Sequence, residues 1–181
     1  MRRFILTGAP GCGKTSILAA LRDQGYAVVP EAATDVIARE QARGVDEPWT
    51  RPEFIDQIVG LQHARQLEAG QNGASVQLYD RSPVCTLALA RYLDQPVPVR
   101  LADEIQRLID QQIFQRPVFF VRPIGFIQPT SARRISYAES LAFERLHESA
   151  YREHGFELID VPPAPVRERA ALVARHLELR S

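Results

Sequence analysis

The sequence is poor in several residue types. Its 181 residues include a single lysine, Lys14, so every other basic side chain apart from the histidines is an arginine. The two cysteines, Cys12 and Cys85, are too few and too far apart for a disulfide framework or a zinc-binding spacing. This cysteine usage predicts a reducing, cytoplasmic setting.

An excess of charge is also missing. The 22 basic residues are balanced by 22 acidic ones, so no overall field attracts nucleic acid or anionic lipid. After the N-terminal arginines the apolar run of residues 4–6 is far too short for a signal peptide or a membrane span. We expect a soluble, unexported protein that acts on a small molecule, with no nucleic acid or membrane as partner; no feature indicates a protein partner.

Short apolar runs alternate with longer amphipathic ones along the chain, as in units that join parallel strands through helices. The apolar runs predict five strands, at residues 4–7, 26–29, 76–79, 118–121 and 156–161. Apolar residues at helical spacing predict helices that include residues 101–112 and 166–177. Because the length suits one domain, we predict a single α/β domain over residues 1–181, with a mainly parallel five-stranded sheet.

Two segments depart from this alternation. Residues 31–73 insert two helices after the second predicted strand, and we expect them to form one wall of a cleft. Within them, Thr50, Pro52 and Glu53 have the order of an N-cap, an early helical proline and a capping-box acid, which predicts a helix from about residue 50 to residue 69. Residues 122–137 are rich in proline and arginine and predict a flap.

The first predicted strand leads into a glycine-rich segment, Gly8-Ala9-Pro10-Gly11-Cys12-Gly13-Lys14-Thr15-Ser16. Glycine, four residues, glycine, lysine and threonine form the pattern of a P-loop. Glycines let successive backbone N–H groups face phosphate oxygens, and the positive end of the next helix adds to the attraction. Lys14 is then expected to reach the β- and γ-phosphates, and the Thr15 hydroxyl to bind Mg²⁺. We therefore predict an ATP·Mg²⁺ site bound by residues 8–16.

Other residues disfavour several classes of nucleotide-binding protein. Ser16 stands where the Rossmann fingerprint has its third glycine. A Ras-like switch reads guanine with a second lysine, which the chain lacks. AAA motors and ABC ATPases end the third strand with Asp-Glu, whereas this chain has Asp80-Arg81.

Further motifs resemble those of P-loop nucleoside and nucleotide kinases. They are Val29-Pro30-Glu31, Asp80-Arg81-Ser82-Pro83, the pair Arg133-Arg134 and the C-terminal run at residues 151–162. In order and spacing the chain is similar, over nearly its whole length, to the compact bacterial AAA-type ATPase/kinase family that includes the ribosylnicotinamide kinase domain of NAD regulators. The resemblance implies an ATP-dependent phosphotransferase on a three-layer P-loop NTPase fold.

The resemblance also implies roles for two acidic residues. Glu31 corresponds to the general base that takes the proton of the acceptor hydroxyl; the alternative is an acid that stabilises a helix N-terminus. Asp80 corresponds to a Mg²⁺ ligand opposite Thr15, and the alternative is a helix-capping aspartate before Ser82-Pro83. If the reaction is hydrolysis, Glu31 would orient water instead.

Arginines are expected to stabilise charge on the transferred phosphoryl group. The candidates are Arg81, Arg133 and Arg134, with Arg122 as a weaker substitute; the two flap arginines are equally readable as solvated side chains. By analogy with related kinases, the turn at residues 161–166 would contact adenine. Trp49 and Phe54 either stack on an acceptor ring or belong to the core, and His147 is interpreted as a helix-packing residue.

Together these patterns predict transfer of the γ-phosphoryl group of ATP to a nucleoside-like or other hydroxyl acceptor. Lys14, Glu31, Asp80, Arg81, Arg133 and Arg134 are the predicted catalytic residues, with Mg²⁺ held by Thr15 and Asp80. Two alternatives stay open: an NTPase that acts as a regulatory or partner-binding module, and a nucleotide sensor with negligible turnover.

Overall fold

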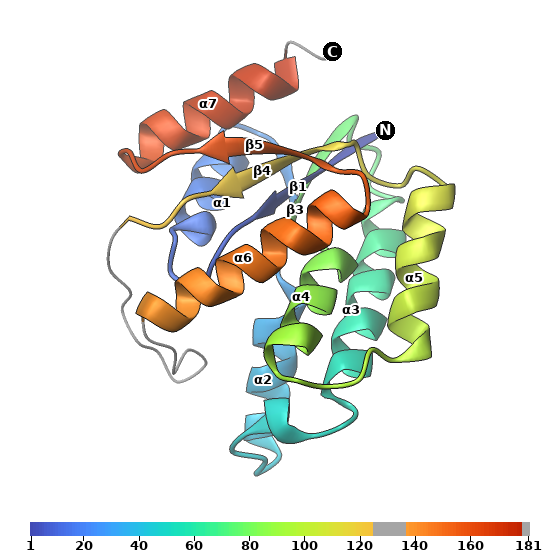
Figure 1. Ribbon diagram of the computed structural model, residues 1–181. Helices are drawn as coiled ribbons and strands as arrows, with labels where there is room; N and C mark the ends of the chain where they lie inside the picture. Colours follow the sequence, from blue (N-terminus) through green and yellow to red (C-terminus); the bar gives the residue numbers. More distant parts are fainter. Residues whose placement is uncertain (125–136, 179–181) are drawn as a thin grey trace.

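A five-stranded parallel sheet lies at the centre of the protein (Figure 1). The structure, a computed structural model, describes residues 1–124 and 137–178. The strands run in the order β2-β3-β1-β4-β5, with the bounds β1 Arg2–Thr7, β2 Ala27–Val29, β3 Val76–Asp80, β4 Pro117–Val121 and β5 Glu157–Val161. All five predicted strands are confirmed, with small differences at their ends, and so is the α/β fold.

Helices cover both faces of the sheet and complete the predicted three layers (Figure 1). Side chains along a strand alternate between faces, so Phe4 and Leu6 pack in one core while Ile5 packs in the other. Helices α1 and α7 cover the first core, and α2 to α6 contribute to the second. The helices are α1 Lys14–Asp23, α2 Ala32–Ala42, α3 Phe54–Ala69, α4 Pro83–Tyr92, α5 Val99–Asp110, α6 Tyr137–Glu153 and α7 Val166–Glu178.

The segment after β2 contains α2, a short 3₁₀ helix at Pro48–Thr50 and α3. The predicted start of α3 near Thr50 is wrong, because the helix begins at Phe54 and Glu53 occupies its N-cap. Arg51 has extended backbone angles of φ −86° and ψ 139°, as expected of a residue before proline. Pro52 therefore separates the 3₁₀ turn from α3 instead of opening one continuous helix.

Helix α4 starts as the sequence predicts, with Ser82 at the N-cap and Pro83 as the first helical residue. The Ser82 hydroxyl makes no capping bond; it lies 2.8 Å from the phenol oxygen of Tyr151 in α6. No helix within the described part of the chain is both long and apolar enough to span a membrane. Residues 125–136 of the predicted flap, which include Arg133 and Arg134, lie outside the described residues.

The strand order decides where the predicted site residues meet. The carboxyl ends of parallel strands share one edge of a sheet, and ligands of α/β proteins bind at that edge. Strands β2, β3 and β1 are neighbours there, and they lead into Pro30-Glu31, Arg81 and Gly8 respectively. The fold thus brings together motifs that lie about 20 to 70 residues apart in the sequence.

Candidate active site

The loop between β1 and α1 carries the P-loop sequence and curls against β4. Gly8 has φ 140°, and a Cβ atom there would lie 2.3 Å from the carbonyl oxygen of Val121, so only glycine fits. Gly13 caps α1 with φ 91°, and the first helical bond of α1 runs from the Ile17 N–H to the Gly13 carbonyl at 3.2 Å. The backbone N–H groups before Ile17 make no hydrogen bond within the helix. Unpaired N–H groups at the start of a helix form an anion-binding site.

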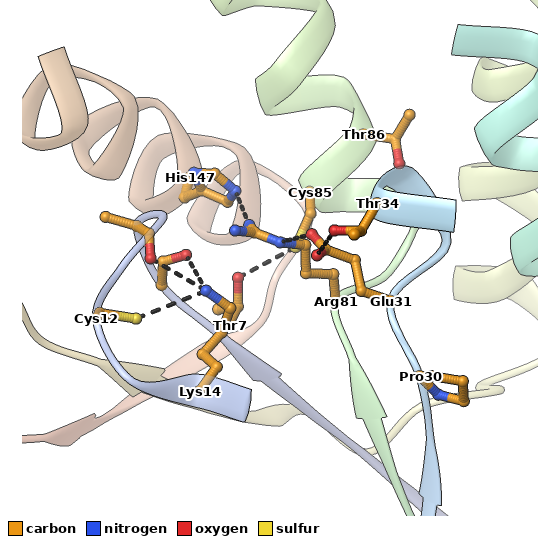
Figure 2. Close-up of polar contacts among 12 residues, drawn as sticks. Thr7, Cys12, Lys14, Pro30, Glu31, Thr34, Arg81, Cys85, Thr86 and His147 are labelled. Carbon is orange, nitrogen blue, oxygen red and sulfur yellow. Dashed lines mark hydrogen bonds and ion pairs between the residues drawn. The ribbon is translucent and has the colours of Figure 1, made fainter. Parts of the chain in front are cut away.

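Lys14 lies over this loop and is only 7% exposed. Its Nζ donates to the carbonyl oxygens of Gly8 and Ala9, both at 3.0 Å, and lies 3.6 Å from Cys12 Sγ (Figure 2). These partners match the three donors of an ammonium group. The loop's own atoms are therefore sufficient to hold the positive charge in place.

The two predicted Mg²⁺ ligands follow neighbouring strands. Thr15 is exposed at the start of α1, and Asp80 ends β3, where it pairs with Leu6 of β1. Hydroxyl and carboxylate oxygens are ligands that Mg²⁺ prefers, so this donor set suits the ion. Among residues 1–124 and 137–178 there is no group of three or more His, Cys, Asp and Glu side chains that would hold a metal. The metal role of Thr15 and Asp80 stays a prediction.

Glu31 follows β2 and occupies the N-cap of α2, yet its carboxylate makes no capping bond. Oε2 accepts a hydrogen bond from the Thr34 hydroxyl at 2.7 Å, and Oε1 pairs with Arg81 Nε at 2.5 Å. Burial raises the pKa of Glu31, but the charges of Arg81 and Lys14 and the two side-chain hydrogen bonds outweigh it and lower the pKa to about 2. The side chain is thus ionised at neutral pH and turned toward Arg81.

Arg81 connects Glu31 to helix α6. Its backbone has φ 71° directly after β3, a conformation that is costly for a residue with a side chain. Nε faces Glu31, and Nη1 lies 2.9 Å from Nε2 of His147 (Figure 2). Burial opposes the charge of Arg81, but the Glu31 carboxylate raises its pKa. These side-chain contacts stabilise the strained backbone.

His147 packs as the sequence predicts, and it also takes part in this network. Its ring is fully buried and packs edge-on against Phe143, with 4.3 Å between ring centroids. Nδ1 lies 2.8 Å from the Phe143 carbonyl oxygen. Because a carbonyl can only accept, Nδ1 carries the proton and Nε2 accepts the hydrogen bond from Arg81. The packing interpretation was right but incomplete.

The buried state of His147 predicts an acid-sensitive stability. Burial and the charge of Arg81 hold its pKa well below the usual 6.5. Below pH 6.5 the unfolded chain then binds a proton that the folded protein does not, so the free energy of unfolding should fall by up to about 1.4 kcal/mol per pH unit. Chemical denaturation between about pH 7 and pH 5 measures this slope.

The matched variant is His147→Gln, which keeps an acceptor for Arg81 but has no titratable ring. Its slope over that range should be smaller than the wild-type slope, by up to the same amount per pH unit. Identical slopes in the two proteins would mean that His147 is protonated in the folded state, in conflict with the hydrogen bonds described above.

A cavity of about 190 Å³ opens beside Glu31 and Arg81. Most of its lining is apolar and comes from α2, the 3₁₀ helix, α3, α4 and α6, including Ile37, Trp49, Phe54, Leu89, Tyr92 and Phe143. Gln62 and Thr86 add a polar pair, in which the Thr86 hydroxyl donates to Gln62 Oε1 at 3.0 Å. The segment after β2 forms one wall, as predicted. Trp49 is half-buried at this wall, whereas Phe54 both lines the cavity and belongs to the core.

Arg122, the weaker candidate for phosphate contact, serves a structural purpose. Its guanidinium bonds to three carboxylates of α6 and β5, those of Glu144 (2.6 Å), Asp160 (2.7 Å) and Glu148. These contacts argue against a role in phosphate binding. Arg133 and Arg134 lie outside the described residues, and the contact of residues 161–166 with adenine stays a prediction.

Two arginines that the sequence did not single out support the backbone of the site. Arg65 of α3 donates from Nη1 to the carbonyl oxygens of Pro30 (3.1 Å) and Glu31 (2.6 Å). Arg169 of α7 donates from Nη1 to the carbonyl oxygen of Cys12 (2.8 Å), inside the P-loop. Neither arginine belongs to a motif, so only the fold reveals these contacts.

A protein-family model described as an AAA domain matches residues 3–169. The chain belongs to an AAA domain family. This match confirms the prediction that the chain is a member of a P-loop, kinase-like family. No curated protein matches the sequence at a significant level.

Solved structures of deoxyadenosine kinase from M. mycoides are similar to the structure of this protein. The structure with the products dCMP and a flexible dCDP matches with a TM-score of 0.63 and 15% identity, covering 97% of this chain and 98% of that one. The dATP complex gives 0.63 and 16%, with 97% and 99% coverage, and the dCTP complex gives 0.64 and 16%, with 98% and 99%. At this identity the likeness establishes the fold.

Proposed function

We propose that the protein transfers the γ-phosphoryl group of ATP to a hydroxyl group of a small, nucleoside-like acceptor bound in the cavity. The observation that carries this proposal is the ionised Glu31 carboxylate at the cavity wall, paired with Arg81 at 2.5 Å and electrostatically coupled to Lys14. A carboxylate so placed suits proton transfer from a bound alcohol. Membership of an AAA domain family and the P-loop kinase fold support ATP as the donor.

The lining of the cavity favours an uncharged, ring-bearing acceptor. Aromatic side chains such as Trp49 and Tyr92 suit a flat ring, and the Gln62–Thr86 pair offers hydrogen bonds at its edge. Among the described residues that line the cavity, Arg81 is the only one with a positive charge, and its ion pair with Glu31 neutralises that charge. An acceptor that carried its own phosphate would need a further cation. We therefore favour a nucleoside over a nucleotide as acceptor.

In the proposed reaction, the P-loop N–H groups and Lys14 hold the β- and γ-phosphates. Thr15 and Asp80 would hold Mg²⁺, which would supply positive charge to neutralise the phosphates. The acceptor oxygen forms a bond to the γ-phosphorus as the bond to the ADP oxygen breaks, and Glu31 takes the hydroxyl proton. A base of low pKa suffices, because the transition state is loose and the proton is transferred late. When Glu31 takes the proton it loses its negative charge, so the Arg81 charge beside it becomes available to stabilise charge on the transferred group.

The remaining assignments are part of the same proposal. Both thiols, Cys12 and Cys85, are free and buried, which suits the reducing cytoplasm. A small molecule is the partner that the cavity supports. The hydrolase and sensor alternatives differ from the kinase in what happens to the γ-phosphate, so one assay separates all three.

The deciding experiment incubates the protein with γ-labelled ATP and a panel of nucleosides and vitamin-like alcohols. We expect slow ATP loss alone, strong stimulation by one acceptor, and label transferred to that acceptor. The matching nucleoside monophosphate should not be labelled, and Lys14→Ala serves as the blank. Label released only as free phosphate, at the same rate with every acceptor, would favour the hydrolase; tight ATP binding without turnover would favour the sensor.

A further inference from the structure

Arg169 in α7 is buried behind the P-loop, with 3% of its surface exposed. Besides the bond from Nη1 to the Cys12 carbonyl, its Nη2 donates to the carbonyl oxygen of Arg122 at 2.7 Å and more weakly to that of Val161 at 3.4 Å. Arg122 directly follows β4, and Val161 ends β5. One guanidinium thus bonds the P-loop to the ends of two strands.

The positive charge of Arg169 has no protein counter-ion among the described residues. No carboxylate within residues 1–124 and 137–178 forms an ion pair with it, and its buried Nε has no hydrogen-bond partner there. Burial lowers the pKa of Arg169 accordingly. A buried cation without a counter-ion destabilises the folded protein. An anion bound nearby would therefore stabilise it.

The P-loop is the place where such an anion would bind. A Cβ atom on Gly13 would lie 3.2 Å from Nη1 of Arg169, so the guanidinium lies directly against the loop. Lys14, the next residue, brings the other buried positive charge of this loop. Two buried cations against one turn suit a ligand with several negative charges better than a singly charged one.

The bond to Cys12 also sets the direction of an N–H group. The Cys12 carbonyl and the Gly13 N–H belong to one planar trans peptide, so they point in opposite directions. Arg169 holds the carbonyl on the α7 side, and the Gly13 N–H is therefore directed away from α7. An anion cradle needs its N–H groups to be fixed in this way before the ligand arrives.

We propose that Arg169 is a positioning residue of the nucleotide site, which orients the Cys12–Gly13 peptide toward the phosphate chain and adds a second buried charge that bound phosphates neutralise. This inference rests on the proposed nucleotide site. It is independent of whether the γ-phosphate goes to an alcohol or to water, because it concerns binding alone.

The test compares three variants with the wild-type protein. Arg169→Met removes the charge and the donors, Arg169→Lys keeps the charge without the planar fork, and Arg175→Met removes an exposed charge from the same helix. Calorimetric titration gives the dissociation constants for ATP and for inorganic tripolyphosphate, below the melting temperature of every variant. Tripolyphosphate isolates the phosphate chain from the base.

We expect Arg169→Met to raise the dissociation constants for ATP and for tripolyphosphate by the same factor, about tenfold or more. Arg175→Met should bind both ligands with wild-type affinity. Arg169→Lys should recover part of the loss. A purely structural role would lower the melting temperature and leave tripolyphosphate binding unchanged in the folded variants; that result would overturn the proposal. If Arg169→Met does not fold, unchanged tripolyphosphate affinity in Arg169→Lys overturns it instead.

The outcomes also separate this inference from the proposed kinase activity. A wild-type protein that binds ATP but phosphorylates no acceptor would contradict the kinase and leave the Arg169 comparison valid. A wild-type protein that binds neither ATP nor tripolyphosphate would overturn both.

Discussion

We expect the Lys14→Ala protein to fold and to lose phosphoryl transfer by about 10²–10³-fold in kcat, together with much of its affinity for ATP. Lys14 Nζ is the charge that the P-loop carbonyls of Gly8 and Ala9 hold over the loop. No other lysine exists in the chain to replace it. Single-turnover kinetics with labelled ATP and calorimetric titration of ATP measure the two losses separately.

The matched control is Arg22→Ala, which removes a positive charge from the exposed end of the same helix, α1. It should bind ATP and turn over like the wild type. Thermal unfolding of both variants verifies that they are folded at the assay temperature. Wild-type ATP affinity in a folded Lys14→Ala protein would contradict the predicted contact between Lys14 and the phosphates.

The second large effect is expected for Glu31→Gln. An amide cannot take a proton from the acceptor, so kcat should fall by about 10²–10⁴-fold. ATP affinity should change little, because the Glu31 carboxylate bonds to Thr34 and Arg81 and not to the P-loop. Replacing the carboxylate also leaves the Arg81 charge without its anion, which should lower the free energy of unfolding by about 1–3 kcal/mol. Steady-state kinetics with the identified acceptor and chemical denaturation measure these effects.

Glu153→Gln is the control for breaking an ion pair elsewhere. Glu153 of α6 pairs with Arg91 at 2.8 Å on the surface, and its replacement should leave kcat unchanged. A Glu31→Gln protein with wild-type kcat would remove Glu31 from the reaction and would favour the interpretation of this residue as an acid placed at a helix start.

The sheet and the P-loop could be predicted because their signals are local. Apolar runs mark the strands, and the spacing of Gly8, Gly13 and Lys14 marks the loop within a few residues. The start of α3 was predicted wrongly from equally local signals. Thr50 and Glu53 have the right order for a capping box, but Pro52 favours an extended residue before it, and this preference decides the local structure.

The contacts around Arg81 could not be predicted, because they depend on packing between distant segments. The sequence motifs place Glu31 and Arg81 at the ends of two strands, and so at one edge of the sheet. Nothing in these motifs indicates the ion pair between the two residues or the positive φ of Arg81. His147 lies 66 residues from Arg81, and Arg169 lies 157 residues from Cys12. Each has a local environment typical of an ordinary helical residue, so periodicity alone assigns it to packing.

The solitary lysine gives this protein an unusual chemical property. Its one side-chain amine is enclosed by two carbonyl oxygens and a sulfur atom, and an acylating reagent reacts only with an amine that has shed its proton and left such partners. Amine-directed labelling on most proteins samples the whole surface. Here, once the label on the N-terminal α-amine is counted separately, it would report on the opening of a single turn. Occupancy of that turn by a ligand would then be readable from the labelling rate, without any introduced probe.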